Sequence, residues 1–394
     1  MTTTEIAELP LLEPGSPPAE LDRLRELGWA ARSERGLEVL RHDECHAVLK
    51  HPLLRTRWSE RLDAFELREG PVREMWDRML ISSQGPARKR LRRPLSRLLS
   101  PRTSESLRDV SREIAEDLAD EIADGDTADL LEAVAWQLPP RMYCHLVSAD
   151  KRFAATAAAL SDGIISPILT VDLSRQQESV DALIEARRFA AEHIRARSAE
   201  LGDDFTSRLI REQEKSGLSD AELVDEAVTL MAASIDNTVH QIAIAFGVLL
   251  EERSRWESLL REPGGVEAAV DETIRLRPRF GSILRVPIED VDLFGVHVPA
   301  GSQVHVNVRA AQRDPRAFGD ATDTFVADRQ STGQHVMFGN GQYSCIGRFL
   351  ARIEVQECVS VFLERFPDLR LDGDWTVRHT PVVSEVTSLK VRLR

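Results

Sequence analysis

The chain has 394 residues, of which 65 are acidic and 51 basic, so its formal net charge is −14. Apolar residues make up 42% of the chain, which allows a large buried core and argues against intrinsic disorder. The acidic balance argues against a general nucleic-acid-binding protein, which would present basic charge to phosphates. At about 150 residues per domain, the length allows two or three domains.

The beginning of the chain shows no targeting signal. Residues 1–20 contain Glu5, Glu8, Glu13 and four prolines, without a basic start that leads into an apolar run, so we expect a flexible segment and no signal peptide. The longest clean apolar stretch, Ile242–Leu250, is far shorter than the roughly 20 residues of a membrane span. We therefore expect a cytoplasmic protein without a membrane partner. The cysteines form no CxxC pair, which argues against a disulfide framework or a structural zinc site.

The pattern of elements is mainly helical. Leu37–Leu40 predicts a short strand. Helices are then predicted over Thr103–Ala123, Thr127–Leu138, Pro140–Val147, Lys151–Leu160, Arg175–Leu201 and Asp203–Lys215. A β-rich stretch follows at Ile283–Val308, then a helix near Ile346–Arg365 and a terminal strand pair at Val382–Leu393. No repeat or linker marks a domain boundary.

One predicted helix is unusually long and apolar. Ser219 and Glu222 form a capping box, and the helical pattern continues to about Glu252, a length of ~50 Å at 1.5 Å per residue. Its apolar centre is interrupted by a polar group: Ser234, Asp236, Asn237 and Thr238. One interpretation is a polar kink whose hydrogen bonds are satisfied. The other is a polar notch that faces a ligand or cofactor cavity.

The most informative segment surrounds Cys345. Two glycines, Gly339 and Gly341, frame a tight loop, and the cysteine comes just before a predicted helix. A helix N-terminus stabilises a thiolate, which can be a nucleophile or a metal ligand. The alternative is an ordinary buried thiol, which we expect for Cys144 and Cys358.

The surrounding pattern extends this reading. Phe338–Arg352, FGNGQYSCIGRFLAR, resembles the haem-binding signature of the cytochrome P450 family, Phe-Gly-x-Gly-x-His-x-Cys-x-Gly-x-x-Leu-Ala-Arg. The resemblance implies that Cys345 is the axial thiolate on the iron of haem b. It also implies that Phe338 and Gly339 lie near this thiolate and that Gly347 lets the backbone approach the porphyrin.

Further family motifs occur in the expected order. Glu272 and Arg275 resemble the ExxR helix, and Arg329 resembles the third member of its structural network. Arg285 would then bind a haem propionate. The family context makes the segment with His42, Cys45 and His46 an ordinary early helix rather than a metal site, and the resemblance covers nearly the whole chain.

A basic stretch, Arg88–Arg102, contains no acidic residue. It resembles the family's C-helix, and the resemblance implies that Arg88 and Arg92 bind a haem propionate. Helical spacing places Lys89, Arg93 and Arg97 on another face, which could dock an acidic electron donor.

Three positions depart from the family pattern. Tyr343 replaces a His or Arg that contacts a propionate, and Ser234 replaces a Gly of the central helix. Asn237 replaces the Thr that helps to deliver protons, next to the acid Asp236, while Thr238 matches the common second Thr but points about 100° away. Asp236, Asn237 and Thr238 are the candidate catalytic residues. An amide is a poor proton relay, so two reactions stay open: ordinary oxygen insertion, or oxidative C–C, C–O or C–N coupling.

The resemblance implies a single domain over residues 1–394, with the triangular, mainly helical P450 fold and small β-sheets. It implies a monomeric monooxygenase that uses O2, and electrons from a ferredoxin and its reductase, to hydroxylate a hydrophobic or aromatic intermediate of secondary metabolism. Ala233 would lie beside the haem. The substrate pocket would include Trp76, Ala232, Asn237, Phe280, Ile283 and Leu284. A haem-binding sensor or carrier without catalysis is the alternative outside enzymology.

Overall fold

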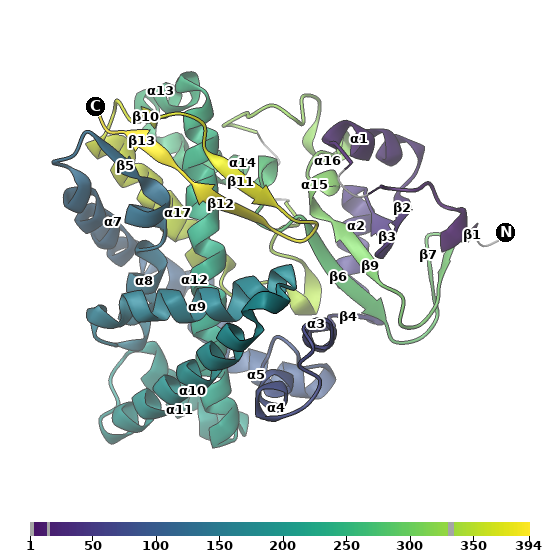
Figure 1. Cartoon of the computed structure of the whole chain (residues 1–394), viewed down its shortest axis with the longest axis horizontal. Helices are drawn as coiled ribbons and strands as arrows, with labels where there is room; N and C mark the ends of the chain where they lie inside the picture. Colours follow the sequence, from purple (N-terminus) through teal and green to yellow (C-terminus); the bar gives the residue numbers. More distant parts are fainter. Residues whose placement is uncertain (1–3, 14–15, 330–334) are drawn as a thin grey trace. The chain divides into compact units, whose positions relative to one another are not determined.

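The computed structural model describes residues 4–13, 16–329 and 335–394, and it divides into two compact units (Figure 1). The first unit comprises Met1–Arg57, Glu267–Cys345 and His379–Ser384. The second unit comprises Trp58–Val266, Ile346–Arg378 and Glu385–Arg394. The two units are described separately below, and the single domain over residues 1–394 stays a prediction.

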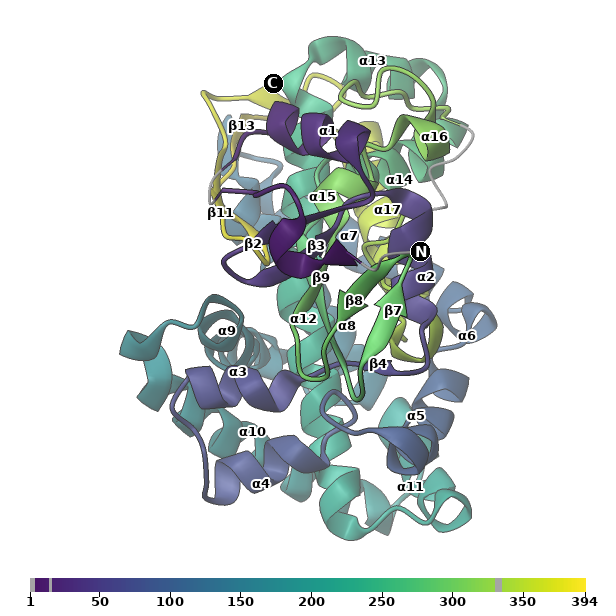
Figure 2. The same ribbon diagram turned by 90° about the vertical axis from the view of Figure 1, so that its right-hand side faces the viewer.

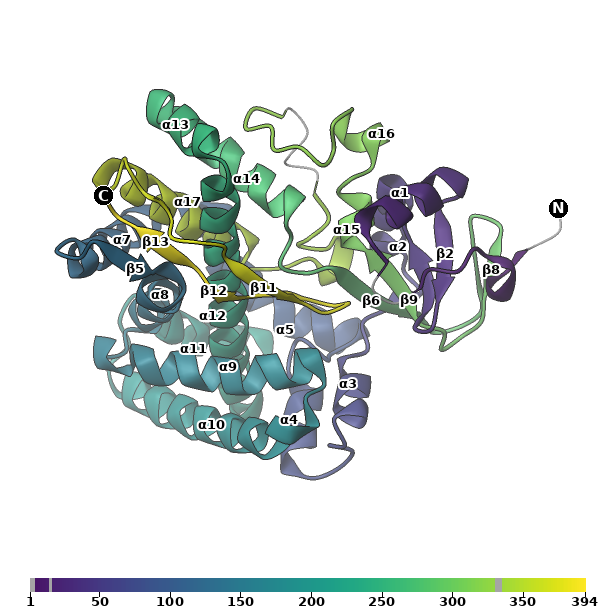
Figure 3. The same cartoon turned by 45° about the horizontal axis from the view of Figure 1, so that its top comes forward.

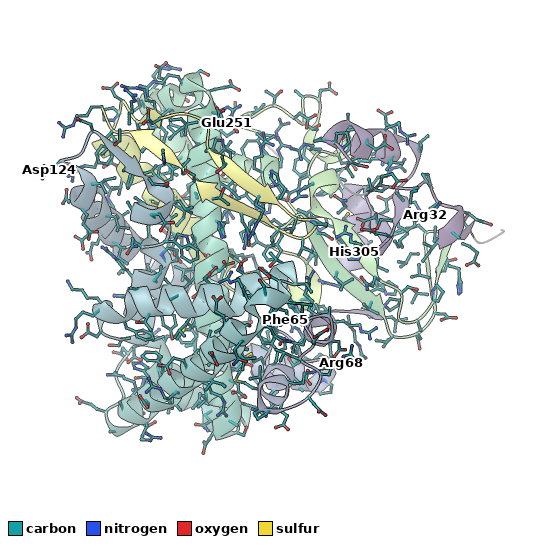
Figure 4. The ribbon with its side chains drawn as sticks, viewed as in Figure 1. Arg32, Phe65, Arg68, Asp124, Glu251 and His305 are labelled. Atoms are coloured by element: carbon teal, nitrogen blue, oxygen red, sulfur yellow. The ribbon has the colours of Figure 1, made fainter. Side chains whose placement is uncertain are left out.

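The first unit is built on a five-stranded sheet of order β2-β3-β9-β6-β4. Its strands are β2 (Ala30–Ser33), β3 (Gly36–Val39), β4 (Leu54–Arg55), β6 (Ser282–Pro287) and β9 (Val304–Asn307). β3 and β9 run parallel, with Leu37 beside Val304, and the other neighbours are antiparallel. Figure 4 labels Arg32 on β2 and His305 on β9. A smaller sheet joins β1 (Thr4–Glu5), β8 (Val296–Val298) and β7 (Val291–Leu293).

Short helices complete the first unit. They are η1 (Ile6–Glu8), α1 (Pro18–Leu27), α2 (His42–Lys50), α14 (Val266–Leu276), α15 (Val308–Ala311), α16 (Pro315–Phe318) and η7 (Gly341–Tyr343). The strand predicted at Leu37–Leu40, the early helix and the β-rich stretch are confirmed. Within residues 1–20, β1 pairs with β8 and Leu12 is buried, while residues 1–3 and 14–15 lie outside the described residues. The flexibility expected of this segment stays a prediction.

The second unit consists mainly of helices (Figures 1 and 3). They are α3 (Trp58–Ala64), α4 (Pro71–Arg78), α5 (Gly85–Leu98), α6 (Pro101–Glu105), α7 (Arg108–Ile122), η2 (Leu131–Ala135), α8 (Leu138–Val147), η3 (Lys151–Phe153), α9 (Ala154–Thr170), η4 (Leu173–Arg175), α10 (Gln176–Ala199), α11 (Phe205–Ser216), α12 (Asp220–Glu251), α13 (Arg253–Arg261), η5 (Pro263–Gly265) and α17 (Arg348–Arg365). A sheet of β10 (Arg370–Leu371), β13 (Lys390–Arg392) and β5 (Thr127–Asp129) flanks them, and β11 (Thr376–His379) pairs with β12 (Ser384–Ser388).

Helix α12 is the core helix of the second unit, as its sequence predicts. It begins at the Ser219 capping box and contacts α8, α9, α10 and α17 (Figure 2). Its last residue, Glu251, is labelled in Figure 4. By length and composition alone, α12 and the segment Lys151–Thr170 could each cross a membrane, but 83% and 61% of their apolar windows are buried inside the protein. Burial of this kind is what core helices of a globular protein show.

Four element predictions need correction. The helix expected at Thr103–Ala123 is interrupted after α6, where the Ser106 hydroxyl bonds to the Thr103 carbonyl. Thr127–Leu138 is not one helix, because β5 pairs with β13 and only a π-helical turn follows. α9 continues ten residues beyond Leu160, to Thr170. The two terminal strands exist, but they pair with other strands rather than with each other.

Candidate active site

The Cys345 loop, residues 338–345 of the first unit, presents a thiol at its end. Gly339 and Gly341 have φ values of 66° and 65°, a region that residues with a Cβ rarely adopt, so both positions of this tight turn favour glycine. The Cys345 amide donates to the Phe338 carbonyl at 2.8 Å and closes the loop. The loop therefore holds the cysteine by backbone geometry.

Among the four cysteines of the chain, Cys345 is the exposed one. Burial raises the pKa of the Cys144 thiol to about 11, and it also raises the pKa values of Cys45 and Cys358. Because the thiolate is the form that binds metals, these three are poor candidate ligands. Cys345 is thus the cysteine with an accessible thiol.

Arg285 and Tyr343 lie together in the first unit, and Tyr343 is part of the Cys345 loop. The guanidinium carbon of Arg285 is 5.0 Å from the centre of the Tyr343 ring, a cation–π geometry. Arg285 is 2% exposed and donates to the Leu284 carbonyl at 2.9 Å. Tyr343, two residues before the cysteine, therefore steadies a cation where the family pattern would supply one.

Glu272, Arg275 and Arg329 are brought together in the first unit. Arg275 donates two hydrogen bonds to the Glu272 carboxylate, at 2.7 and 2.8 Å, and Arg329 donates a third at 3.1 Å. The Val326 amide adds a fourth at 3.0 Å. Glu272 and Arg275 are fully buried, so this is a charge network and not the surface ion pair that ExxR alone would suggest.

Gly347 begins the helix that follows the cysteine. It is the N-cap of α17, which starts at Arg348, two residues later than predicted. The first amides of a helix lack partners within the helix and carry positive dipole charge. A Cβ added to Gly347 would meet no described atom within 4 Å, so the glycine leaves room beside the backbone.

A polar notch interrupts the buried surface of α12 in the second unit. Between Leu230 and Leu250, Ala233 is exposed, Ser234 and Asn237 are half-buried, and the other residues of the helix are buried. We call Ala233, Ser234 and Asn237 the α12 notch. The Asn237 Oδ1 atom is buried and has no hydrogen-bond partner among the described residues. Between Leu230 and Leu250, the notch is thus the part of α12 that is not buried.

Asp236 and Thr238 are buried and do not belong to the α12 notch. The Asp236 Oδ1 atom lies 3.8 Å from His240 Nε2, and the Asp236 amide donates to the Ser161 hydroxyl of α9 at 3.3 Å. That hydroxyl in turn donates to the Ala232 carbonyl at 3.1 Å. The Thr238 hydroxyl donates to the Ser234 carbonyl at 3.0 Å. Ser161 and His240 are site residues that sequence reasoning missed; the i, i+4 spacing from Asp236 pointed to His240, and nothing pointed to Ser161.

Helix α5 of the second unit separates its cations by face, as predicted. Arg88 is buried and donates to the Leu80 carbonyl at 2.6 Å, and Arg92 is half-buried. Lys89, Arg93 and Arg97 are exposed. Arg97 already forms an ion pair with Glu212 at 3.0 Å, so it is less available to a partner than the sequence suggested.

The predicted pocket residues are divided between the two units. Phe280, Ile283 and Leu284 of the first unit are half-buried. Trp76 and Ala232 of the second unit are buried, and the Trp76 indole nitrogen has no partner among the described residues. That these residues line a substrate pocket stays a prediction for both units.

An exposed cysteine after a glycine turn, a buried cation packed on Tyr343 and a buried Glu–Arg–Arg network are the features of the first unit that bear on a cysteine-ligated prosthetic group. A model of the cytochrome P450 family matches residues 266–384. The chain is 30% identical over 386 residues to the cytochrome P450 monooxygenase PikC of Streptomyces venezuelae. This alignment covers 94% of this chain and 90% of that relative. It is 32% identical over 275 residues to 6-deoxyerythronolide B hydroxylase of Saccharopolyspora erythraea, with 68% and 67% covered. The structure of the myxobacterial cytochrome P450 CYP267B1 in complex with myristic acid is similar, with a TM-score of 0.84 at 28% identity and 96% of each chain covered.

The chain belongs to the cytochrome P450 family. It is a monooxygenase of that family and binds haem b. The residues present fit this cofactor: one accessible sulfur ligand stands at the end of a tight loop, and a cationic side chain near it suits a propionate.

Proposed function

We propose that Cys345 is the axial ligand of the haem iron and that Arg285 binds a haem propionate, with Tyr343 steadying its guanidinium. The observation that carries this proposal is the exposure of Cys345 at the end of the Phe338–Cys345 loop, while the other cysteines are buried. Phe338 and Gly339 shape the same loop. The roles of Arg88 and Arg92 at a propionate, and of Ala233 and Gly347 beside the porphyrin, stay predictions from the family resemblance.

Thiolate-ligated haem supplies the chemistry of O2 activation. The roles of the polar residues of α12 in this chemistry depend on which of their side chains are accessible. Asn237 is the accessible residue among the three candidate catalytic residues, so we assign it to contact with the substrate or with bound water. Asp236 is fully buried beside His240, so we assign it to positioning behind the α12 notch and not to direct contact with the substrate. The Thr238 hydroxyl is used within the helix, so we assign Thr238 to the structure of α12 and not to the reaction.

The substrate is proposed to be a hydrophobic or aromatic intermediate of secondary metabolism, which the protein oxygenates. Support comes from the relatives, among them 6-deoxyerythronolide B hydroxylase, and from the apolar candidates Trp76, Phe280, Ile283 and Leu284. Turnover under 18O-labelled O2 tests the reaction: label in the product supports oxygen insertion, and a product without label contradicts it. Candidate substrates can be found by the spectral shift that binding causes in the haem-loaded protein.

Oxidative coupling is the second candidate reaction, and the amide at the α12 notch favours it. Asn237 provides a carboxamide where the family pattern has a hydroxyl, and a carboxamide is a poor proton relay. Asn237→Thr separates the two candidates. If coupling without oxygen insertion is the native reaction, the variant should shift product toward incorporation of labelled oxygen. An unchanged product would argue that Asn237 has no special role.

The electron donor is proposed to be an acidic ferredoxin that docks on α5. Lys89 and Arg93 are exposed there, and no described acidic side chain pairs with them. Opposite charges on two partners speed and orient their association. Replacing both cations by glutamate should raise the KM for a ferredoxin about tenfold at low salt, since exposed charges contribute ~0.5–1 kcal/mol each. The control is Lys151→Glu on η3, and an equal effect of both changes would contradict this docking site.

A further inference from the structure

We propose that His46 of α2 is a positioning residue for the Cys345 loop and that it acts through Asn340. The inference rests on the proposed role of Cys345 as the haem ligand. Asn340 lies between the two glycines of the loop, five residues before the cysteine, and His46 is nearly 300 residues earlier in the chain. Both residues belong to the first unit.

The side-chain amide of Asn340 links the loop to α2. Its oxygen bonds within the loop, and its nitrogen bonds to α2. Its Oδ1 atom accepts the Gly341 amide at 2.7 Å, and its Nδ2 atom lies 2.7 Å from His46 Nδ1. A carboxamide has one acceptor end and one donor end. Because the Gly341 amide can only donate, it fixes Oδ1 on its own side, and Nδ2 must therefore donate to His46. The geometry assigns the acceptor role to His46 Nδ1, with the ring proton on Nε2.

Helix α2 is fixed by contacts within the first unit, so it can support the Cys345 loop. The His42 amide donates to the Asp314 carboxylate at 3.0 Å, and the His42 ring, which is 5% exposed, packs edge-on against Phe318 and His46. The C-terminal end of α2 also meets the loop directly. A Cβ added to Gly341 would lie 3.2 Å from the Leu49 carbonyl oxygen. The loop therefore lies close against the end of α2 and is joined to it by the amide bridge.

The bridge acts between the two glycines of the loop. Gly339 and Gly341 flank Asn340, and both have left-handed φ values. Glycine has the largest conformational freedom to lose, so a loop with two glycines is the part of the site that most needs an external restraint. His46 supplies this restraint through Asn340. We expect its loss to loosen the thiolate ligation and not to remove it.

The test compares variants that keep or lose the acceptor, in the haem-loaded protein. His46→Leu has a similar size but no acceptor, whereas His46→Asn places an amide oxygen near the position of Nδ1. Two properties are measured: hydrogen exchange at the Gly341 amide, and the rate at which the red-shifted Soret band of the reduced CO complex is lost. With Leu, both rates should rise about fivefold, the factor that one neutral hydrogen bond of ~1 kcal/mol represents. With Asn, they should stay near the wild-type rates.

Two controls separate this role from its alternatives. His297→Leu, on β8, tests for the loss of a half-buried histidine elsewhere in the first unit and should change neither rate. In Asn340→Ala the bridge is already gone, so adding His46→Leu should have little further effect. Rates in His46→Leu equal to those of the wild type would overturn the inference. Absence of the red-shifted band in the wild type would instead refute the role of Cys345, and Gly341 exchange would still report on His46.

Discussion

Replacing Glu226 by glutamine should remove a pH-dependent loss of stability. Glu226 lies on α12 and is 1% exposed; its Oε1 atom accepts the Leu80 amide at 2.7 Å, and its Oε2 atom has no partner among the described residues. Burial raises the pKa of this carboxyl group to about 8, from an ordinary value of 4.5. The Leu80 amide opposes this shift, and nearby Asp225 adds to it.

The sign and size of the effect follow from this pKa. Between pH 4.5 and 8 the folded protein keeps the Glu226 proton while the unfolded chain releases it, so stability falls as pH rises. From pH 5 to pH 8 the loss is on the order of 3 kcal/mol, since one pKa unit corresponds to about 1.4 kcal/mol. Glutamine cannot ionise and can still accept the Leu80 amide. Glu226→Gln should therefore be increasingly more stable than the wild type as pH rises.

Thermal unfolding of the haem-loaded protein at several values between pH 5 and pH 8 measures this difference. The matched control is Glu69→Gln, a change at an exposed position of the same unit, which should follow the wild type throughout. A difference between Glu226→Gln and the wild type that stays constant over this pH range would refute the reasoning. So would a variant that loses relative stability toward pH 8.

Three further predictions concern the site. Glu272→Gln leaves two buried guanidinium groups without their carboxylate and should destabilise the protein by ~3–5 kcal/mol in chemical unfolding, against less than about 1 kcal/mol for the exposed Glu257→Gln. Tyr343→Leu removes the ring beneath Arg285 and should speed haem loss several-fold in transfer to apomyoglobin, since cation–π pairs contribute ~0.5–2 kcal/mol, whereas Tyr343→Phe should not. Ser161→Ala removes the hydroxyl that joins α9 to α12 and should change hydrogen exchange at the Asp236 amide more than twofold; unchanged exchange would contradict the bridge.

The local features of the site could be predicted from the sequence. The Ser219 capping box, the glycine turn before Cys345 and the ExxR pair are all encoded within a few residues, and local patterns of this kind are readable without a structure. The polar group in α12 was also visible, but which of its members is accessible depends on what packs around the helix. Asn237 is open while Asp236 is covered by His240 and α9, and only the three-dimensional arrangement distinguishes them.

Errors other than the break after α6 came from contacts between distant residues. Thr127–Asp129 has helical composition, but it forms a strand because it pairs with β13 from the end of the chain. α9 runs through Gly163, where a Cβ would approach Ala182 of α10 to 3.1 Å, so a residue that weakens a helix in isolation serves its packing. The His46–Asn340 bridge and the Ser161 bridge likewise join residues too far apart in sequence for any local pattern to connect.

The ligation of haem by Cys345 is the central claim, and the absorption spectrum of the reduced protein under CO tests it most directly. The four cysteines allow a matched series in which each is replaced by alanine in turn. Variants at Cys45, Cys144 and Cys358 should keep the red-shifted Soret band of thiolate-ligated haem whenever they fold and bind haem. Cys345→Ala should lose that band while the helices and sheets of the protein remain folded. A red-shifted band in Cys345→Ala, or its loss in one of the other three variants with the fold intact, would contradict the account.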